Sequence, residues 1–155
     1  MIAVGVDAGS RMTKIVLWDR GRGAVAATGS VEHHVDQGAS ARELRDALLR
    51  QVGHTTAEVK GAVATGYGRN LVDFADTTIT EITCHARGVR EGRPEVRTII
   101  EIGGQDSKLI RLDERGHVRD FMMNDRCAAG TGRFLEMVAQ RVGVGLGDLG
   151  GLARA

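Results

Sequence analysis

The sequence predicts a mixed α/β protein in which one unit of three strands and a helix occurs twice. Short apolar runs that end in glycine alternate with longer segments of helical periodicity. When the chain is laid on itself, "DAGSRMTKIVLWD" (7–19) falls on "EIGGQDSKLIRLD" (101–113). The 155 residues, 42% of them hydrophobic, suffice for two small lobes, which we expect over residues 1–95 and 96–155.

The first copy is expected to begin with three strands, at residues 2–9, 13–19 and 24–34. A helix is expected over 40–53, where apolar residues recur on one face. Ser40 is its predicted N-cap, with Glu43 at capping-box spacing, and Gly53 is its predicted end.

The remaining elements are predicted in the same way. A strand is expected within 59–68, and helical segments are expected within 70–76 and 80–92. The second copy then repeats three strands and a helix, at residues 97–104, 107–113, 117–124 and 130–143.

Composition excludes several classes of protein. The net charge of +1 argues against nucleic acid or an anionic membrane as a partner, and 3% aromatic residues argue against base stacking. The sequence has neither an apolar run of ~18 residues nor a signal peptide at its start. Cys84 and Cys127 show no disulfide framework, so a cytoplasmic location is expected.

Each copy places an acidic residue at a strand end, directly before a glycine turn. The bare N–H groups of such a turn can approach an anion, and the carboxylate can hold Mg²⁺ or orient a water. We therefore expect Asp7 and Glu101 to be catalytic, and two facing hairpins to grip a triphosphate. A single Asp-x-Gly is an ordinary turn, so the hypothesis depends on the second copy.

The residues around the two turns are the candidate phosphate ligands. They are Gly9, Ser10, Arg11, Lys14, Gly103, Gly104, Gln105 and Asp106. Lys14 can neutralise phosphate or can equally be a strand-surface lysine. Neither a Walker loop nor a dinucleotide-binding glycine motif occurs at these turns.

Cys127 lies within "MNDRCAAGTGRFLE" (123–136), before an expected helix. It is a candidate nucleophile, metal ligand or small buried residue. A helix N-terminus offers partial positive charge and free N–H groups, which stabilise a thiolate or an anionic iron–sulfur cluster. Cys84, in the middle of another expected helix, is interpreted as a core residue.

Five segments carry a resemblance to a known family. They are "GVDAGSRMTKIVL", "ATGYGRN" (64–70), "EITCHARG" (81–88), "IIEIGGQDSK" (99–108) and "MNDRCAAGTGRFLE". They closely resemble the activator ATPases of 2-hydroxyacyl-CoA dehydratases and the ATP-binding subunits of benzoyl-CoA reductases. The resemblance extends from about residue 3 to residue 150. It implies the ribonuclease H-like superfold of actin, Hsp70 and sugar kinases, here with one complete lobe plus the β-meander and first helix of a second.

The resemblance also implies a function. ATP hydrolysis with Mg²⁺ would drive a low-potential electron from a 4Fe-4S cluster, bridging a homodimer, into a partner dehydratase or reductase. A ferredoxin or flavodoxin would supply that electron. Each subunit would give two cysteine ligands, of which Cys127 matches the first.

Two residues and the length of the chain depart from the family pattern. Arg11 stands where the first turn usually has a threonine, and Glu101 stands for the usual aspartate. Family members continue beyond this length, with the second cysteine and the adenosine-binding motif in the continuation. Two alternatives therefore stay open: a sugar or acyl kinase of the same superfold, and a truncated, non-catalytic actin-like module.

Overall fold

The computed structural model describes residues 1–32, 36–124 and 131–154. Its contacts divide the chain into two compact units, Met1–His85 and Ala86–Ala155. No helix in the described ranges is long and apolar enough to cross a membrane.

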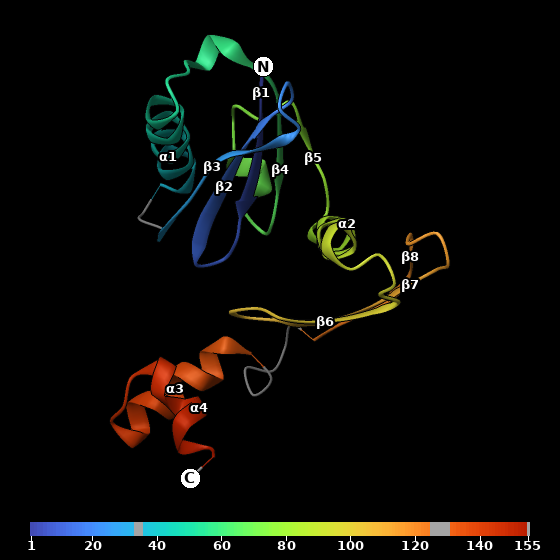
Figure 1. Cartoon of the computed structure of the whole chain (residues 1–155). Helices are drawn as coiled ribbons and strands as arrows, with labels where there is room; N and C mark the ends of the chain where they lie inside the picture. The colour runs from blue at the N-terminus through green and yellow to red at the C-terminus, as the bar shows by residue number, and fades with distance from the viewer. Residues whose placement is uncertain (33–35, 125–130, 155) are drawn as a thin grey trace. The chain divides into compact units, whose positions relative to one another are not determined.

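The first unit is built on a five-stranded sheet with the order β3-β2-β1-β4-β5 (Figure 1). Its strands are β1 (Ile2–Ala8), β2 (Met12–Asp19), β3 (Ala24–Glu32), β4 (Val59–Thr65) and β5 (Thr77–Thr78). The first three form an antiparallel meander, whereas β4 and β5 run parallel to β1. The parallel pair β1 and β4 therefore brings two strand ends, and the turns that follow them, to one edge of the sheet.

Helix α1 (Gln37–Gln51) covers one face of this sheet. Buried and partly exposed residues alternate along β1, as expected for a strand with one face on the core. The core cluster comprises Ile2, Val4, Val6, Ala8, Ile15, Leu17, Ala27, Ala41, Leu48, Leu49, Ala62, Ala64 and Val72. At Gly29 a Cβ atom would lie 3.0 Å from Leu44 Cδ1, so the glycine allows α1 to pack close to β3.

The predicted start of α1 is wrong. The helix begins at Gln37, and its N-cap is Asp36, whose carboxylate accepts a hydrogen bond from the Ala39 N–H at 2.9 Å. Ser40 lies inside the helix, where its hydroxyl donates to the Asp36 carbonyl at 3.0 Å. Asp36, four residues before Ser40, thus supplies the capping oxygen, and the helix begins one turn earlier than predicted.

The predicted helix over 70–76 is also wrong. A short 3₁₀ turn, η1 (Thr56–Glu58), precedes β4. After β4 the chain forms only another such turn, η2 (Arg69–Leu71), and then joins the sheet edge as β5. Asp76 explains this, because its N–H donates to the Ala62 carbonyl at 2.9 Å and its carboxylate accepts the Ala62 N–H at 2.7 Å. Two hydrogen bonds to one residue of β4 fix the end of this segment beside that strand, directly before β5.

The second unit contains a three-stranded antiparallel sheet with the order β6-β7-β8. Its strands are β6 (Thr98–Ile102), β7 (Ser107–Leu112) and β8 (Val118–Asn124), and α2 (Glu81–Gly92) precedes them. Helix α3 (Gly132–Val142), the turn η4 (Leu146–Asp148) and the short α4 (Leu149–Leu152) follow. Met122 and Met123 of β8 are 69% and 47% exposed.

The predicted repeat is present in the backbone. The elements β1, β2, β3 and α1 return in the same order as β6, β7, β8 and α3. The β2–β3 ladder shifts register between Leu17 and Trp18, and the β7–β8 ladder shifts between Arg111 and Leu112, which are the aligned positions. The two copies therefore share the same irregularity as well as the same strands.

Candidate nucleotide site

The first hairpin holds a carboxylate and a lysine side by side. Asp7 near the end of β1 pairs in register with Lys14 of β2, and Lys14 Nζ lies 3.0 Å from Asp7 Oδ2. Both side chains are exposed, at 42% and 56%. The Gly9 N–H donates to the Met12 carbonyl at 3.1 Å and closes the turn that carries the exposed Ser10 and Arg11.

The second hairpin repeats this design. Glu101 of β6 pairs in register with Lys108 of β7, whose Nζ lies 3.0 Å from Glu101 Oε2. The Gly103 N–H donates to the Asp106 carbonyl at 2.8 Å, as Gly9 does in the first copy. Gly104 and Gln105 are exposed in this turn.

The two lysines differ in burial. Lys108 is only 4% exposed and has a second carboxylate, Asp106, at 2.6 Å, whereas one close carboxylate contacts the exposed Lys14. Burial by itself would lower the pKa of Lys108, but the hydrogen bonds to Asp106 and Glu101 outweigh it and raise the pKa. Lys108 is therefore a fixed counter-ion, and Lys14 is a cation accessible to a ligand.

A second turn, at the end of β4, supports the first hairpin. Thr65 at the end of β4 pairs with Asp7, and the Gly68 N–H donates to the Ala8 carbonyl at 2.8 Å. Gly66 has a φ of +89°, and a Cβ there would lie 2.5 Å from the Ala8 oxygen, so only glycine fits. Tyr67 between them is 86% exposed.

Gln37, at the start of α1, is a supporting residue that sequence reasoning missed. Its side-chain amide donates to the Gly9 carbonyl at 2.9 Å, and its side chain packs against Gly68. No pattern in the sequence marks this contact, which joins the start of a helix to a turn 28 residues earlier.

A pocket of about 700 Å³ opens on the sheet face away from α1. Asp7, Lys14 and Thr65 line it, together with Cys84 of α2 and residues of β1 to β4. Cys84 is half-buried here rather than in the core cluster. The pocket gives the carboxylate–lysine pair of the first unit access to a ligand.

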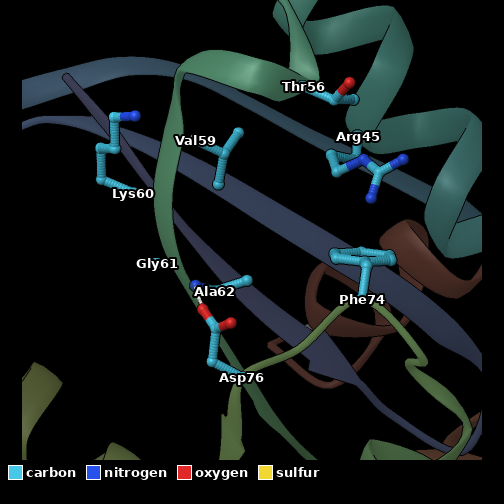
Figure 2. A pocket seen from close by; sticks show the side chains of 8 residues that line it. All are labelled: Arg45, Thr56, Val59, Lys60, Gly61, Ala62, Phe74 and Asp76. Carbon is cyan, nitrogen blue, oxygen red and sulfur yellow. Dashed lines mark hydrogen bonds between the residues drawn. The ribbon is translucent and has the colours of Figure 1, made fainter.

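A second pocket, of about 440 Å³, lies around the start of β4 (Figure 2). The Arg45 guanidinium carbon lies 4.2 Å from the centre of the Phe74 ring, and Asp76 accepts the Ala62 N–H. Arg45 also lies 2.7 Å from the Asp46 carboxylate. Arg45 and Asp76, two of the charged residues that line this pocket, are thus already engaged with the protein.

The start of α3 is docked on the second hairpin. The Gly132 and Arg133 N–H groups donate to the Gly103 and Gly104 carbonyls at 2.9 and 3.1 Å. The expectation that these N–H groups are free for a thiolate or cluster is therefore wrong, because the turn carbonyls use them. Cys127 lies outside the described residues.

No group of three or more histidine, cysteine or acidic side chains suited to a metal ion occurs within residues 1–32, 36–124 and 131–154. The groups that fit a Mg²⁺-bound phosphate are instead the single carboxylates at the strand ends, since Mg²⁺ in nucleotide sites is held by one or two carboxylates and the phosphates.

Comparison with known proteins decides the family. The model of the BadF/BadG/BcrA/BcrD ATPase family matches residues 4–155. The chain belongs to this family. The expected resemblance to activator ATPases is confirmed, and so is the predicted superfold of actin, Hsp70 and sugar kinases.

Three similar proteins show how far the likeness extends. The 2-hydroxyisocaproyl-CoA dehydratase activator of Clostridioides difficile is 41% identical over 99% of this chain and 57% of its own length. The activator of lactoyl-CoA dehydratase from Anaerotignum propionicum is 45% identical over 90% of this chain and 53% of its own. The solved structure of the Clostridium difficile activator with bound ADPNP has a TM-score of 0.88 at 40% identity, over 99% of this chain and 57% of that one. The chain thus spans a little over half the length of these relatives.

Proposed function

We propose that this chain is the nucleotide-handling and cluster-bearing part of an ATP-dependent reductive activator. The activator would drive a low-potential electron into a 2-hydroxyacyl-CoA dehydratase or a benzoyl-CoA reductase. The main support is the carboxylate–lysine hairpin, which occurs twice with the same register and turn in a chain of an ATPase family. The ADPNP bound by the similar activator supports a nucleotide as the ligand.

In this proposal the two acidic residues hold Mg²⁺ and orient the water that attacks the terminal phosphate. Asp7 and Glu101 take this role. The phosphates contact the turn residues, namely Gly9, Ser10, Arg11, Lys14, Gly103, Gly104, Gln105 and Asp106. The nearby cations supply the complementary charge, and glycine turns let a phosphate approach the backbone closely.

The difference between the two lysines supports a division of roles. An exposed ion pair contributes about 0–1 kcal/mol, so Lys14 can leave Asp7 for a phosphate at small cost. Lys108 is held by two carboxylates and keeps Glu101 oriented. The first hairpin thus binds phosphate charge, and the second presents a fixed carboxylate.

We further propose that Cys127 ligates a 4Fe-4S cluster shared with a second copy of the chain. When bound, the cluster supplies one-electron redox chemistry at low potential. A ferredoxin or flavodoxin is the proposed electron donor, and the dehydratase or reductase is the proposed acceptor. The names of the similar activators support this class of acceptor.

Calorimetric titration with ADP, with and without Mg²⁺, tests the nucleotide site. Asp7→Ala should weaken Mg²⁺–ADP binding at least about tenfold, because a charged acceptor contributes roughly 1.5–3 kcal/mol. Asp120→Ala removes the same charge from an exposed position of β8 and should bind as the parent does. Equal affinity and equal Mg²⁺ dependence in Asp7→Ala would contradict the proposal.

Anaerobic reconstitution with iron and sulfide tests the cluster. The two cysteines offer a matched pair of variants. Cys127→Ala should lose iron and the absorbance near ~400 nm that thiolate-bound clusters show, whereas Cys84→Ala should keep both. Equal iron in the two variants would exclude Cys127 as a ligand.

A further inference from the structure

Thr65 lies beside Asp7 at the end of the central parallel strand pair. The two residues are register partners of β4 and β1, and both line the pocket of about 700 Å³ on the face away from α1. Lys14 lies on the other side of Asp7, on β2, and lines the same pocket. Three adjacent strands therefore present a cation, a carboxylate and a hydroxyl in one row.

The hydroxyl of Thr65 is buried and has no hydrogen-bond partner among the described residues. Buried polar atoms almost always have a partner, because leaving one without it is unfavourable. A valine has nearly the same shape and would avoid this cost. A hydroxyl at this position thus needs a partner that another state of the site provides.

The Asp7 carboxylate has one oxygen on each side of its strand. Oδ2 lies 3.0 Å from Lys14 Nζ, on the β2 side. Oδ1 lies on the β4 side, where a Cβ on Gly66 would come within 2.6 Å of it. The glycine leaves room for the carboxylate next to Thr65, although no hydrogen bond joins Thr65 and Asp7 in this structure.

We propose that Thr65 is the positioning residue for Asp7 in the nucleotide-bound state. Lys14 leaves Asp7 for the phosphates, and the Thr65 hydroxyl then donates to Asp7 Oδ1. This hydrogen bond keeps the carboxylate oriented toward Mg²⁺ after its lysine partner has gone. The inference rests on the proposed nucleotide function, and it adds to that function a donor exchange from Lys14 to Thr65.

Two variants of Thr65 test the exchange. Thr65→Val keeps the shape and removes the donor, whereas Thr65→Ser keeps the donor. The readout is the Mg²⁺ concentration that gives half-maximal ADP binding in calorimetric titrations of the 155-residue chain. Thr65→Val should need about tenfold more Mg²⁺, and Thr65→Ser should stay within about twofold of the parent, as expected for one hydrogen bond to a charged group.

Thermal unfolding without ligand separates this role from a structural one. Thr65→Val should melt at the same temperature as the parent or higher, because it removes a buried hydroxyl without a partner. Thr98→Val serves as the control, since Thr98 is exposed on β6 and does not line this pocket. It should change neither the Mg²⁺ requirement nor the melting temperature.

The possible results distinguish the donor exchange from the proposed nucleotide function. A parent-like Mg²⁺ requirement in Thr65→Val would overturn the donor exchange and leave the nucleotide function standing. Loss of Mg²⁺ response in both Thr65 variants, together with a lower melting temperature, would show that Thr65 is structural and would also overturn it. A parent chain that binds ADP without regard to Mg²⁺, or does not bind it, would overturn the proposed function and the exchange with it.

Discussion

At the scale of single residues, Lys14 and Lys108 occupy the same position of the repeat in different surroundings. Lys108→Met should lower the free energy of unfolding by about 3 kcal/mol, because it leaves two partly buried carboxylates without their counter-ion. Lys14→Met, the matched control, should cost less than about 1 kcal/mol, since its ion pair is exposed. Urea unfolding followed by circular dichroism measures both.

The pH dependence of the free energy of unfolding of Lys108→Met provides an independent check. Because the pKa of Lys108 is raised above its ordinary value of 10.5 in the folded chain, its contribution is present below that pH and is lost as pH rises above it. The stability difference between the parent and Lys108→Met should therefore narrow in that range. Equal costs for the two lysine variants would contradict the assigned roles.

Alignment of the chain with itself predicted which residues are equivalent in the two hairpins. It placed Lys14 on Lys108 and Asp7 on Glu101, and the structure joins the members of each hairpin as ion pairs. It did not predict that one lysine is buried and the other exposed. Burial depends on the packing around each hairpin, and a match of residue types carries no information about it.

At the scale of elements, the start of α1 gives a direct test of capping. Asp36→Ala should lower the free energy of unfolding by about 1 kcal/mol, because the Ala39 N–H loses its acceptor. Asp36→Asn should keep most of the parent's free energy of unfolding, since asparagine is an equally good N-cap. Ser40→Ala, at the N-cap position expected from sequence, should have a smaller effect. Thermal or urea unfolding checks the order, and a larger cost for Ser40→Ala would contradict the capping observed here.

The errors at the level of elements have one physical origin. Strands and long helices follow from apolar periodicity, which the sequence shows directly. Ser40 and the segment 70–76 were misjudged because their structure is decided by hydrogen bonds to other residues, to Asp36 in one case and to Ala62 in the other. Gln37 escaped the site prediction for the same reason, since its contact is a hydrogen bond to Gly9. Thr65 escaped it because its place beside Asp7 comes from the parallel pairing of β4 with β1.

At the scale of the whole molecule, the two units differ in the size of their cores. The first unit encloses a large apolar cluster between α1 and the sheet. The buried apolar residues of the second are Ala86, Ile99, Ile110, Leu112 and Ala139 among those described. We expect backbone amides of β1 to exchange with deuterium at least about tenfold more slowly than those of β7, because local opening costs less where less apolar surface is buried.

Mass spectrometry of peptides from the two strands measures this difference. The strands β1 and β7 each pair on both sides, so hydrogen bonding alone does not distinguish them. Equal protection would show that the second unit is stabilised by something other than its apolar core. The repeated order of strands and helix was predictable from the sequence, whereas the unequal cores depend on which apolar residues meet.

The matched register shifts after Leu17 and after Arg111 mean that the segments of the two hairpins can replace one another in sequence. A bulge changes which face of the sheet the following residues occupy, and a one-residue slip would invert every side chain beyond it. Because both copies change register at the aligned position, residues 9–19 can be exchanged with residues 103–113 without insertion or deletion, and each side chain keeps its face. In such a chimera the exposed Lys14 and the buried Lys108 would exchange places in the two sheets. The burial of each lysine there would show how much of it is set by the exchanged segment and how much by the residues around it.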